Sequence, residues 1–491
     1  MPQIPRSPSE APRRPWQAIL ALLTTAGIAF ALMQTLVVPA LPFFQREFDA
    51  TASGVTWIAT GFLLSSSVLT PLLGKLGDAY GKKRVLALAL TVFGLGSLGA
   101  AFSWSLGSLV AFRVLQGAGA AVFPLSFGII RDEFPAAKVG LGIGTVSSVF
   151  GAGGGIGLVS SGVILENLDW QWLFLIGGLP VLAAAALIAV LVPESPTNTP
   201  TKPDYAGAGA LSLALASLLL GISQGNAWGW GSAGVISLLA ASSLIFAVWV
   251  RIERRVPEPM VDLAMLSRPK MAGTNVITLL IGFSMFSTFI SLPAFVQMPA
   301  GLPGALAERV DYGFGASIIE SGLFFLPSSL AMMLLGPFAG SLGSRLGPVV
   351  PLRIGIASTC SGLALLALVH DEPWNVYASM ALLGTGLAFV FASTGRLAVD
   401  DARPEETGVA TGINTIMRTI GAAVGAQVAA TIVSASTLTG TSIPVEAGFT
   451  AAFAMGAAGA LVAFVTTLVL PRGERRGRAS PVAEPELEPA S

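Results

Sequence analysis

The sequence predicts an all-α membrane protein with fourteen transmembrane helices. Of its 491 residues, 53% are hydrophobic and 11% are charged, whereas a soluble domain has about 25% charged residues. So few charges cannot cover the surface of a soluble protein of this length, which excludes an ordinary soluble enzyme. Glycine is also abundant, with 57 residues, and small residues allow membrane helices to pack closely.

Fourteen apolar runs are long enough to cross a bilayer, which needs about 20 apolar residues of helix. Polar or Gly/Pro-rich segments separate the runs, and the run at 206–224 is the weakest because it is rich in Ala, Gly and Ser. The runs cover residues 16–39, 55–73, 85–104, 107–130, 139–164, 170–192, 206–224, 230–250, 272–296, 316–338, 349–369, 374–395, 407–433 and 448–470. The polar segments 1–15 and 471–491 are expected to be solvated cytoplasmic tails.

Lysine and arginine are distributed unevenly between the two sides of these runs. If both tails are cytoplasmic, the inner segments hold 23 of the 27 Lys and Arg, and the outer loops hold only Arg46 and Arg309. Membrane proteins keep most of their Lys and Arg on the cytoplasmic side. We therefore expect a multi-pass protein of the cell membrane with both termini in the cytoplasm.

The two halves of the chain contain a repeat. The segments 71–81 and 337–347 share Pro, Gly and Leu at equivalent positions. Residues 16–192 therefore look like a copy of 272–470 in the same orientation, and 206–250 is an extra central helix pair. Two related six-helix bundles with a site between them at mid-membrane are typical of transporters.

The loop after the second run contains a motif, Gly74-Lys75-Leu76-Gly77-Asp78-Ala79-Tyr80-Gly81-Lys82-Lys83-Arg84. Glycines allow a tight turn, and Asp78 can accept hydrogen bonds from a helix N-terminus of the partner bundle. The basic residues are expected to hold the loop against the anionic inner leaflet. The segment resembles the G-x-L-a-D-r-x-G-r-k-r signature of the major facilitator superfamily. We expect a gating role for Gly74, Gly77, Asp78, Gly81, Lys82 and Arg84.

A second motif lies in the fourth run, Arg113-Val114-Leu115-Gln116-Gly117-Ala118-Gly119-Ala120-Ala121. It looks like the R-x-x-q-G-x-g-a-a motif of the same superfamily. A charge inside a bilayer costs at least about 2.5–3.5 kcal/mol, so Arg113 is expected to face the bundle interior or water. Because it lies only about 9 Å deep at 1.5 Å per residue, snorkelling to the surface is an alternative.

Further pathway candidates lie in the first and thirteenth runs. Arg418 is roughly 16 Å deep and is expected to line a cavity, with Asn414 on the same helical face. The first run ends in a segment, 34–42, that resembles the superfamily's L-D-x-T-i-v-n-v-A-L-P, with Met33 in place of the acid. We expect the substrate pathway to be lined by Gln34, Arg113, Gln116, Asn414 and Arg418.

The fifth run is rich in glycine, with Gly151, Gly153, Gly154, Gly155, Gly157 and Gly162. Exporters of the superfamily often have G-x-x-x-G-P-x-x-G-G here, and this match is partial, with Leu158 at the Pro position. Gly153, Gly157 and Gly162 are therefore candidates for an antiporter-like motif. Close helix packing through small residues explains them equally well.

Two further titratable residues, Glu320 and His370, can be interpreted from their positions in the sequence. Glu320 follows Ser317 by three residues, a spacing typical of a capping box at a helix start, and is alternatively a proton site. His370 falls in an outer loop and is expected to be solvated. With this one histidine and one cysteine, Cys360, we expect no metal site, no disulfide and no cofactor.

The resemblance covers nearly the whole chain and points to the 14-spanner drug:H⁺ antiporter branch of the superfamily. It implies export of small amphiphilic molecules, including drugs and antibiotics, by alternating access with proton coupling. Uptake or facilitative transport of a metabolite is an alternative with the same fold. A membrane-embedded enzyme is a further alternative, although it would need carboxylate or His clusters that the sequence does not offer.

The expected partners follow from charge. The net charge is zero, so no nucleic-acid partner is expected. The intramembrane charges are Arg113 and Arg418, and Met33 replaces an acid, so the substrate is expected to be a neutral or anionic amphiphile. We expect a monomer in the lipid bilayer.

Overall fold

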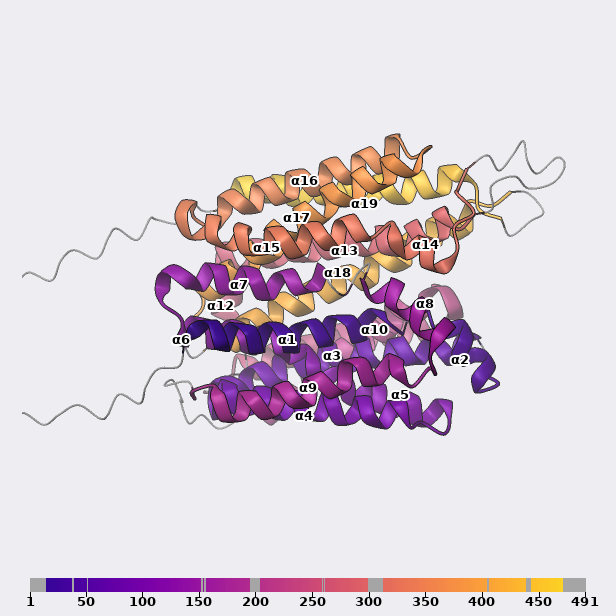
Figure 1. The fold of residues 1–491 in the computed structure, drawn as a ribbon. Helices are drawn as coiled ribbons and strands as arrows, with labels where there is room; N and C mark the ends of the chain where they lie inside the picture. Colours follow the sequence, from indigo (N-terminus) through magenta and orange to yellow (C-terminus); the bar gives the residue numbers. More distant parts are fainter. Residues whose placement is uncertain are drawn as a thin grey trace, which may run out of the picture.

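A computed structural model describes residues 15–37, 39–50, 52–151, 153, 156–194, 204–257, 259, 261–298, 312–403, 406–438 and 443–470. In these ranges the chain forms long helices that lie side by side in one elongated bundle (Figure 1). The extended structure recorded there is one isolated bridge between Thr437 and Pro444. The predicted all-α fold is confirmed.

Among the described residues, thirteen helices are long and apolar enough to cross a membrane. In the first half these crossings are α1 (Trp16–Thr35), α3 (Ala52–Tyr80), α4 (Lys82–Ala101), the continuous α5 (Leu106–Gln116), η1 (Gly117–Ala121) and α6 (Val122–Glu133), and α9 (Trp172–Leu191). The central pair is α10 (Tyr205–Trp228) and α11 (Ala233–Glu253). The second half has α13 (Pro269–Val296), α14 (Ile318–Leu323) followed by α15 (Leu326–Leu346), α16 (Val349–Leu368), α17 (Pro373–Asp401), α18 (Thr407–Ala435) and α19 (Glu446–Val469).

The remaining predicted run, 139–164, is divided into two shorter helices. These are α7 (Ala136–Gly151) and α8 (Gly157–Asn167), which lie one after the other along the bundle (Figure 1). Glycine destabilises a helix interior by about 1 kcal/mol relative to alanine, which favours a break in this segment. At the break the backbone lies directly against α1. A Cβ added to Gly153 would be only 2.5 Å from the Ala31 carbonyl oxygen. Sequence reasoning also missed the short loop helices α2 (Leu41–Glu47) and α12 (Leu263–Ser267).

Buried apolar side chains form separate clusters along the chain. One large cluster comes almost entirely from α1–α9, and a second comes from α13–α19. A smaller cluster joins α10 and α11 to α18 through residues such as Leu211, Trp249 and Ile413.

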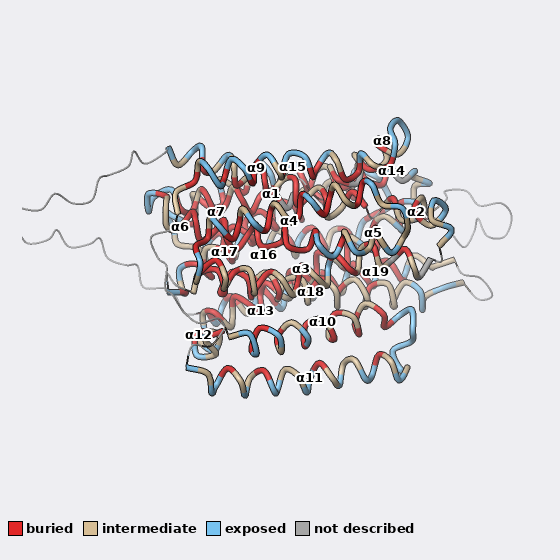
Figure 2. The backbone as a smooth tube through the Cα atoms, turned by 90° about the horizontal axis from the view of Figure 1, so that it is seen from below, coloured by how far each residue is buried: buried red, intermediate tan, exposed pale blue. Residues whose placement is uncertain are grey.

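The central pair lies along one side of the bundle (Figure 2). Helix α10 packs against both α3 and α18, whereas α11 packs chiefly against α10. Near the C-terminal end of α10, the Gln427 side chain on α18 donates to the Ser223 carbonyl at 3.2 Å, and the Thr431 hydroxyl on α18 donates to the Asn226 side chain at 2.7 Å. The pair, through α10, therefore covers the line along which α3 and α18 contact each other. We call this line the α3–α18 seam.

Candidate functional site

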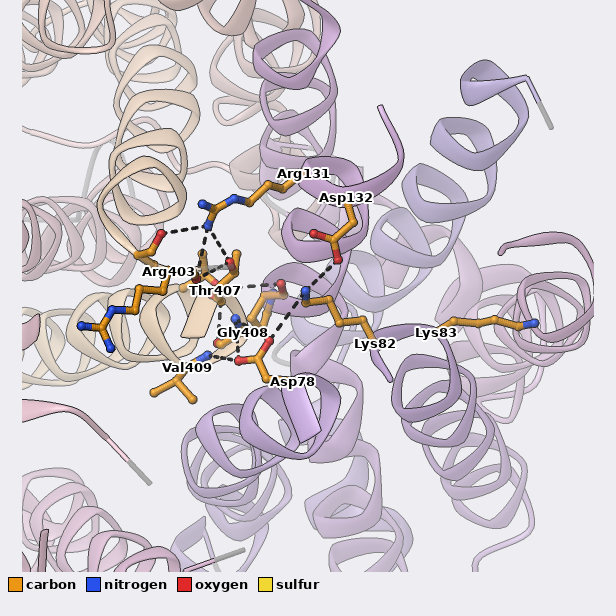
Figure 3. A network of polar contacts seen from close by, with 12 residues as sticks. Asp78, Lys82, Lys83, Arg131, Asp132, Arg403, Thr407, Gly408 and Val409 are labelled. Atoms are coloured by element: carbon orange, nitrogen blue, oxygen red, sulfur yellow. Dashed lines mark hydrogen bonds and ion pairs between the residues drawn. The ribbon is translucent and has the colours of Figure 1, made fainter. Parts of the chain in front are cut away.

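The two halves of the chain meet where α3 ends and α18 begins. We call this the basic end of the bundle, the end at which α1 starts and at which Lys82, Arg84 and Arg131 lie. The Asp78 carboxylate accepts hydrogen bonds from the Gly408 N–H at 3.0 and 3.2 Å and from the Val409 N–H at 3.2 Å (Figure 3). The first N–H groups of a helix have no intrahelical acceptor and carry partial positive charge. Asp78 therefore caps α18, and the expected acceptor role is confirmed.

This capping contact requires the two backbones to touch. A Cβ on Gly74 would lie 2.6 Å from the Gly408 carbonyl oxygen, and a Cβ on Gly408 would lie 2.5 Å from the Gly74 carbonyl oxygen. These separations are shorter than carbon and oxygen tolerate. Glycine at both positions is what brings Asp78 within reach of α18.

The Lys82 side chain is buried next to Asp78 and does not lie at the protein surface. Its side chain is 1% exposed, with Nζ 2.7 Å from Asp132 Oδ2 and 3.9 Å from Asp78 Oδ1. The expectation that Lys82 contacts the lipid leaflet is therefore wrong, because its buried ammonium lies between two carboxylates, Asp78 on α3 and Asp132 on α6. Gly81 precedes it with a φ of 104°, in a region that glycine adopts without strain.

The other motif residues lie around this core. Arg84 is exposed, with Nε 3.2 Å from Glu194 Oε2. Gly77 packs against Leu125, because a Cβ there would collide with that side chain.

Arg131 forms a second connection across the seam. Its guanidinium donates from α6 to the Ala402 carbonyl at 3.0 Å and to the Thr407 hydroxyl at 2.7 Å (Figure 3). Sequence reasoning did not single it out, because one arginine among many at this end has no distinctive pattern. Together Asp78 and Arg131 attach the first half of the chain to the start of α18.

The repeat produces a second seam, between α7 and α15. A Cβ on Gly144 would collide with the Gly336 carbonyl, and one on Gly340 would collide with the Gly140 carbonyl. Ser344, the repeat counterpart of Asp78, lies against Gly140. Both seams are therefore glycine contacts, but the carboxylate cap belongs to the α3–α18 seam.

Arg113 lies inside the first half of the chain. Its Nε donates to the Ile58 carbonyl at 3.1 Å, and its Nη1 donates to the Met33 carbonyl at 3.3 Å and to Gln116 Oε1. The guanidinium also lies 4.2 Å from the centroid of the Phe62 ring, within cation–π range. The side chain is 1% exposed, so the snorkelling alternative is wrong.

The five pathway candidates do not converge on one point. Gln116 donates onward to Ser97 at 3.2 Å, inside the first half. Asn414 is buried and donates to Asn275 at 3.2 Å and to Thr278 at 2.8 Å, inside the second half. Gln34 and Arg418 are only partly buried, and Arg418 lies 4.9 Å from the Phe391 ring centroid. Of the two charged candidates, Arg418 is the more exposed.

Arg113 and Arg418 differ from the described carboxylates in where they lie along the helices. Within the described ranges, the carboxylates lie at or near helix ends or in loops, whereas Arg113 and Arg418 lie within the crossings. The described residues contain no group of three or more His, Cys, Asp or Glu side chains that could hold a metal ion.

Two further sequence interpretations have clear outcomes. The Ser317 N–H donates to Glu320 at 2.8 Å and the Glu320 N–H donates to the Ser317 hydroxyl at 3.2 Å, so the capping box is confirmed. His370 was expected to be solvated, and this is wrong. It is buried, with Nε2 2.9 Å from Glu446 and Nδ1 2.8 Å from the Leu366 carbonyl, because the chain returns to it at the start of α19.

The glycines of the fifth predicted run, in and between α7 and α8, contact neighbouring helices. A Cβ on Gly157 would collide with Thr35 of α1, and one on Gly162 would lie 2.5 Å from Ile319 of α14. These contacts support the packing interpretation of Gly153, Gly157 and Gly162, and an antiporter role for them stays a prediction.

Comparisons with known proteins agree with this architecture. The sequence model of the Major Facilitator Superfamily matches residues 23–426. The tetracenomycin C resistance and export protein of Streptomyces glaucescens is 32% identical over 403 residues, which are 81% of this chain and 72% of that protein. A multidrug resistance protein B homolog of Mycobacterium tuberculosis (strain H37Rv) is 28% identical over 407 residues, covering 80% of this chain and 72% of that protein. The crystal structure of the human organic anion transporter MFSD10 has the same fold, with a TM-score of 0.63 at 16% identity over 92% of this chain and 99% of that one.

We predict that Gly74→Ala separates α3 from α18. Overpacking costs about 1–3 kcal/mol, and each 1.4 kcal/mol is about a tenfold change in an equilibrium. In a Cys360→Ser background, a cysteine replacing the buried Thr411 should react with a water-soluble maleimide about tenfold faster when Gly74→Ala is added.

The matched control is Gly209→Ala on α10, where an added Cβ meets nothing within 4 Å. Its labelling rate should equal that of the parent protein. Equal rates for the two alanine variants would show that the glycine contact does not keep the seam closed.

Proposed function

Because this chain belongs to the Major Facilitator Superfamily, we propose that it is an exporter of small amphiphilic molecules, acting in drug or antibiotic efflux. It is a multi-pass membrane transporter and not an enzyme. Support for export comes from relatives named for resistance and export that match about four fifths of the chain. The observation that supports the mechanism is the Asp78 cap on α18, because it joins the two halves at the basic end through hydrogen bonds that can break and re-form.

We propose that residues 16–192 and 272–470 move as two bundles about a central pathway. The Lys and Arg distribution makes the basic end cytoplasmic, with both termini on that side of the cell membrane. The contacts of Asp78 and Arg131 then close the cytoplasmic side, and export requires that they break and re-form in each cycle. This is alternating access, with the α3–α18 seam as the inner gate.

The energy source is proposed to be the proton gradient. The sequence has no Walker Gly-x-x-x-x-Gly-Lys loop, which a nucleotide-driven pump would need. An ion gradient or the substrate's own gradient must therefore supply the energy.

Substrate charge is proposed to follow from the arginines. Two unit charges about 4 Å apart interact by about 4 kcal/mol at an effective dielectric of about 20. A monovalent cation near Arg418 would be repelled, whereas a carboxylate or phenolate would gain charge-assisted hydrogen bonds. A neutral or anionic amphiphile is therefore the preferred substrate.

The direct test of function is accumulation of tetracenomycin C and of a broad compound panel in cells with and without the gene. Lower accumulation in cells with the gene supports export. Higher accumulation would favour the alternative of uptake, and compound consumption without redistribution in sealed vesicles would indicate an enzyme.

We predict that Asp78→Asn slows transport without changing the substrate pathway. Hydrogen bonds to charged groups contribute about 1.5–3 kcal/mol and neutral ones about 0.5–1.5, so the closed inner gate should lose about 1–2 kcal/mol. The transport rate should fall about tenfold, while equilibrium binding of a transported compound changes by no more than a few fold. Loss of binding with a normal transport rate would place Asp78 in the substrate site instead.

We also predict discrimination by charge. Vesicles containing the protein should move carboxyfluorescein faster than ethidium, and Arg418→Gln should reduce this preference at least tenfold. Arg418→Lys keeps the charge and is the matched control, which should retain the preference. Ethidium export that competes equally with the anion in the unmodified protein would sink the charge hypothesis.

A further inference from the structure

Two carboxylates face each other at the base of the central helix pair. Asp204 directly precedes α10, and Glu253 is the last residue of α11. One oxygen of each is used structurally. Asp204 Oδ1 accepts from the Gly207 N–H at 2.8 Å and caps α10, and Glu253 Oε2 accepts from the Val261 N–H at 3.2 Å.

The two remaining oxygens converge on one buried space. A Cβ on Gly207 would collide with both Asp204 Oδ2 and Glu253 Oε1. Both oxygens are buried and accept no hydrogen bond from a described residue. Glycine at position 207 therefore leaves the room in which the carboxyl groups meet.

A third side chain points into this space. Trp249, one turn before Glu253, is 6% exposed. Its indole N–H interacts with the Glu253 carboxyl group but forms no hydrogen bond of ordinary geometry with a described residue. Two unused acceptors and a donor without a well-formed hydrogen bond mark a polar pocket that the fold does not fully satisfy by itself.

One proton would satisfy this pocket. Two carboxylates whose buried oxygens face one space repel each other when both are charged, and one proton shared between them removes that repulsion. A protonated carboxyl group donates to its neighbour, so both unused oxygens would gain a partner. Asp204 is only partly buried, which gives the pair a route to water at the basic end.

The pair is also connected to the inner gate. The charged groups that act electrostatically on Glu253 are Asp204 and Lys75, and Lys75 acts on Asp78 as well. Lys75 lies on α3, three residues before Asp78, and donates to the Pro259 carbonyl at 3.1 Å. Glu253 accepts from Val261 in the same segment after α11, so a change at the pair can reach α3 through the contact of Lys75 with Pro259.

We propose that Asp204 and Glu253 bind one proton between them and form the proton-carrying site of this transporter. The coupling part of this inference rests on the proposed proton-driven export. The carboxyl pair as a whole takes up and releases the proton, and its presence is transmitted to α3 and Asp78 through the Glu253–Val261 and Pro259–Lys75 contacts.

The proton site is tested by infrared difference spectroscopy on the purified full-length protein in lipid. At neutral pH the unmodified protein should show the carbonyl stretch of a protonated carboxyl group. The band should disappear in Glu253→Gln and in Asp204→Asn. Both amides keep an oxygen that accepts from Val261 or Gly207, so folding is preserved. An unchanged band in both variants would overturn the proposal.

The matched control is Asp262→Asn. Asp262 lies in the same loop region and caps α12 through the Ala264 N–H at 2.8 Å, a role that asparagine also fills. This variant should keep both the infrared band and the transport properties of the parent.

Coupling is tested in sealed vesicles with carboxyfluorescein in two modes, accumulation driven by an imposed pH gradient and exchange at equal pH. Glu253→Gln should lose at least tenfold in accumulation and retain exchange, and Glu253→Asp should recover accumulation. Normal accumulation in Glu253→Gln, or loss of both modes, would overturn the coupling role. If the unmodified protein moves the dye in neither mode, the proposed export of this anion fails, whereas the infrared result still decides the proton site.

Discussion

The contact on which the arrangement depends is the backbone approach between α3 and α18. Gly74 and Gly408 allow the two helices to touch, and only then does the Asp78 carboxylate reach the unpaired N–H groups at the start of α18. A helix N-terminus attracts an anion through its partial positive charge. The interaction joins the two halves at the basic end, and the inner gate that we propose opens by breaking it.

A second constraint is that polar groups within a crossing need partners from the protein itself. Arg113 meets this constraint with the carbonyls of Ile58 and Met33, so its guanidinium links helices of the first half. Arg418 is partly buried and lies beside the Phe391 ring. Two arginines that look equivalent in the sequence thus have different structural settings, and we propose that Arg418 is the one used in substrate recognition.

The crossings were predictable because apolar runs of sufficient length are a local property of the sequence. The acceptor role of Asp78 was also predictable, because an acid among glycines in a repeated loop indicates a tight contact with a helix end. The burial of Lys82 and His370 was not, because each depends on a partner distant in sequence, Asp132 or Glu446. The convergence of Asp204 and Glu253 was hidden for the same reason, since nothing local marks two acids at helix ends as neighbours.

The two seams between the halves of the chain differ, and the central helix pair lies against one of them. The α7–α15 seam has the glycine contacts, with Ser344 where its counterpart has Asp78. The α3–α18 seam has the carboxylate, and α10 packs over it. Two identical seams would open with the same free-energy cost. Because Asp78 and Lys82 are buried at the α3–α18 seam, we expect the free energy of opening that seam to depend on nearby charges. Helix α10 therefore lies directly against the seam that we propose to be the inner gate.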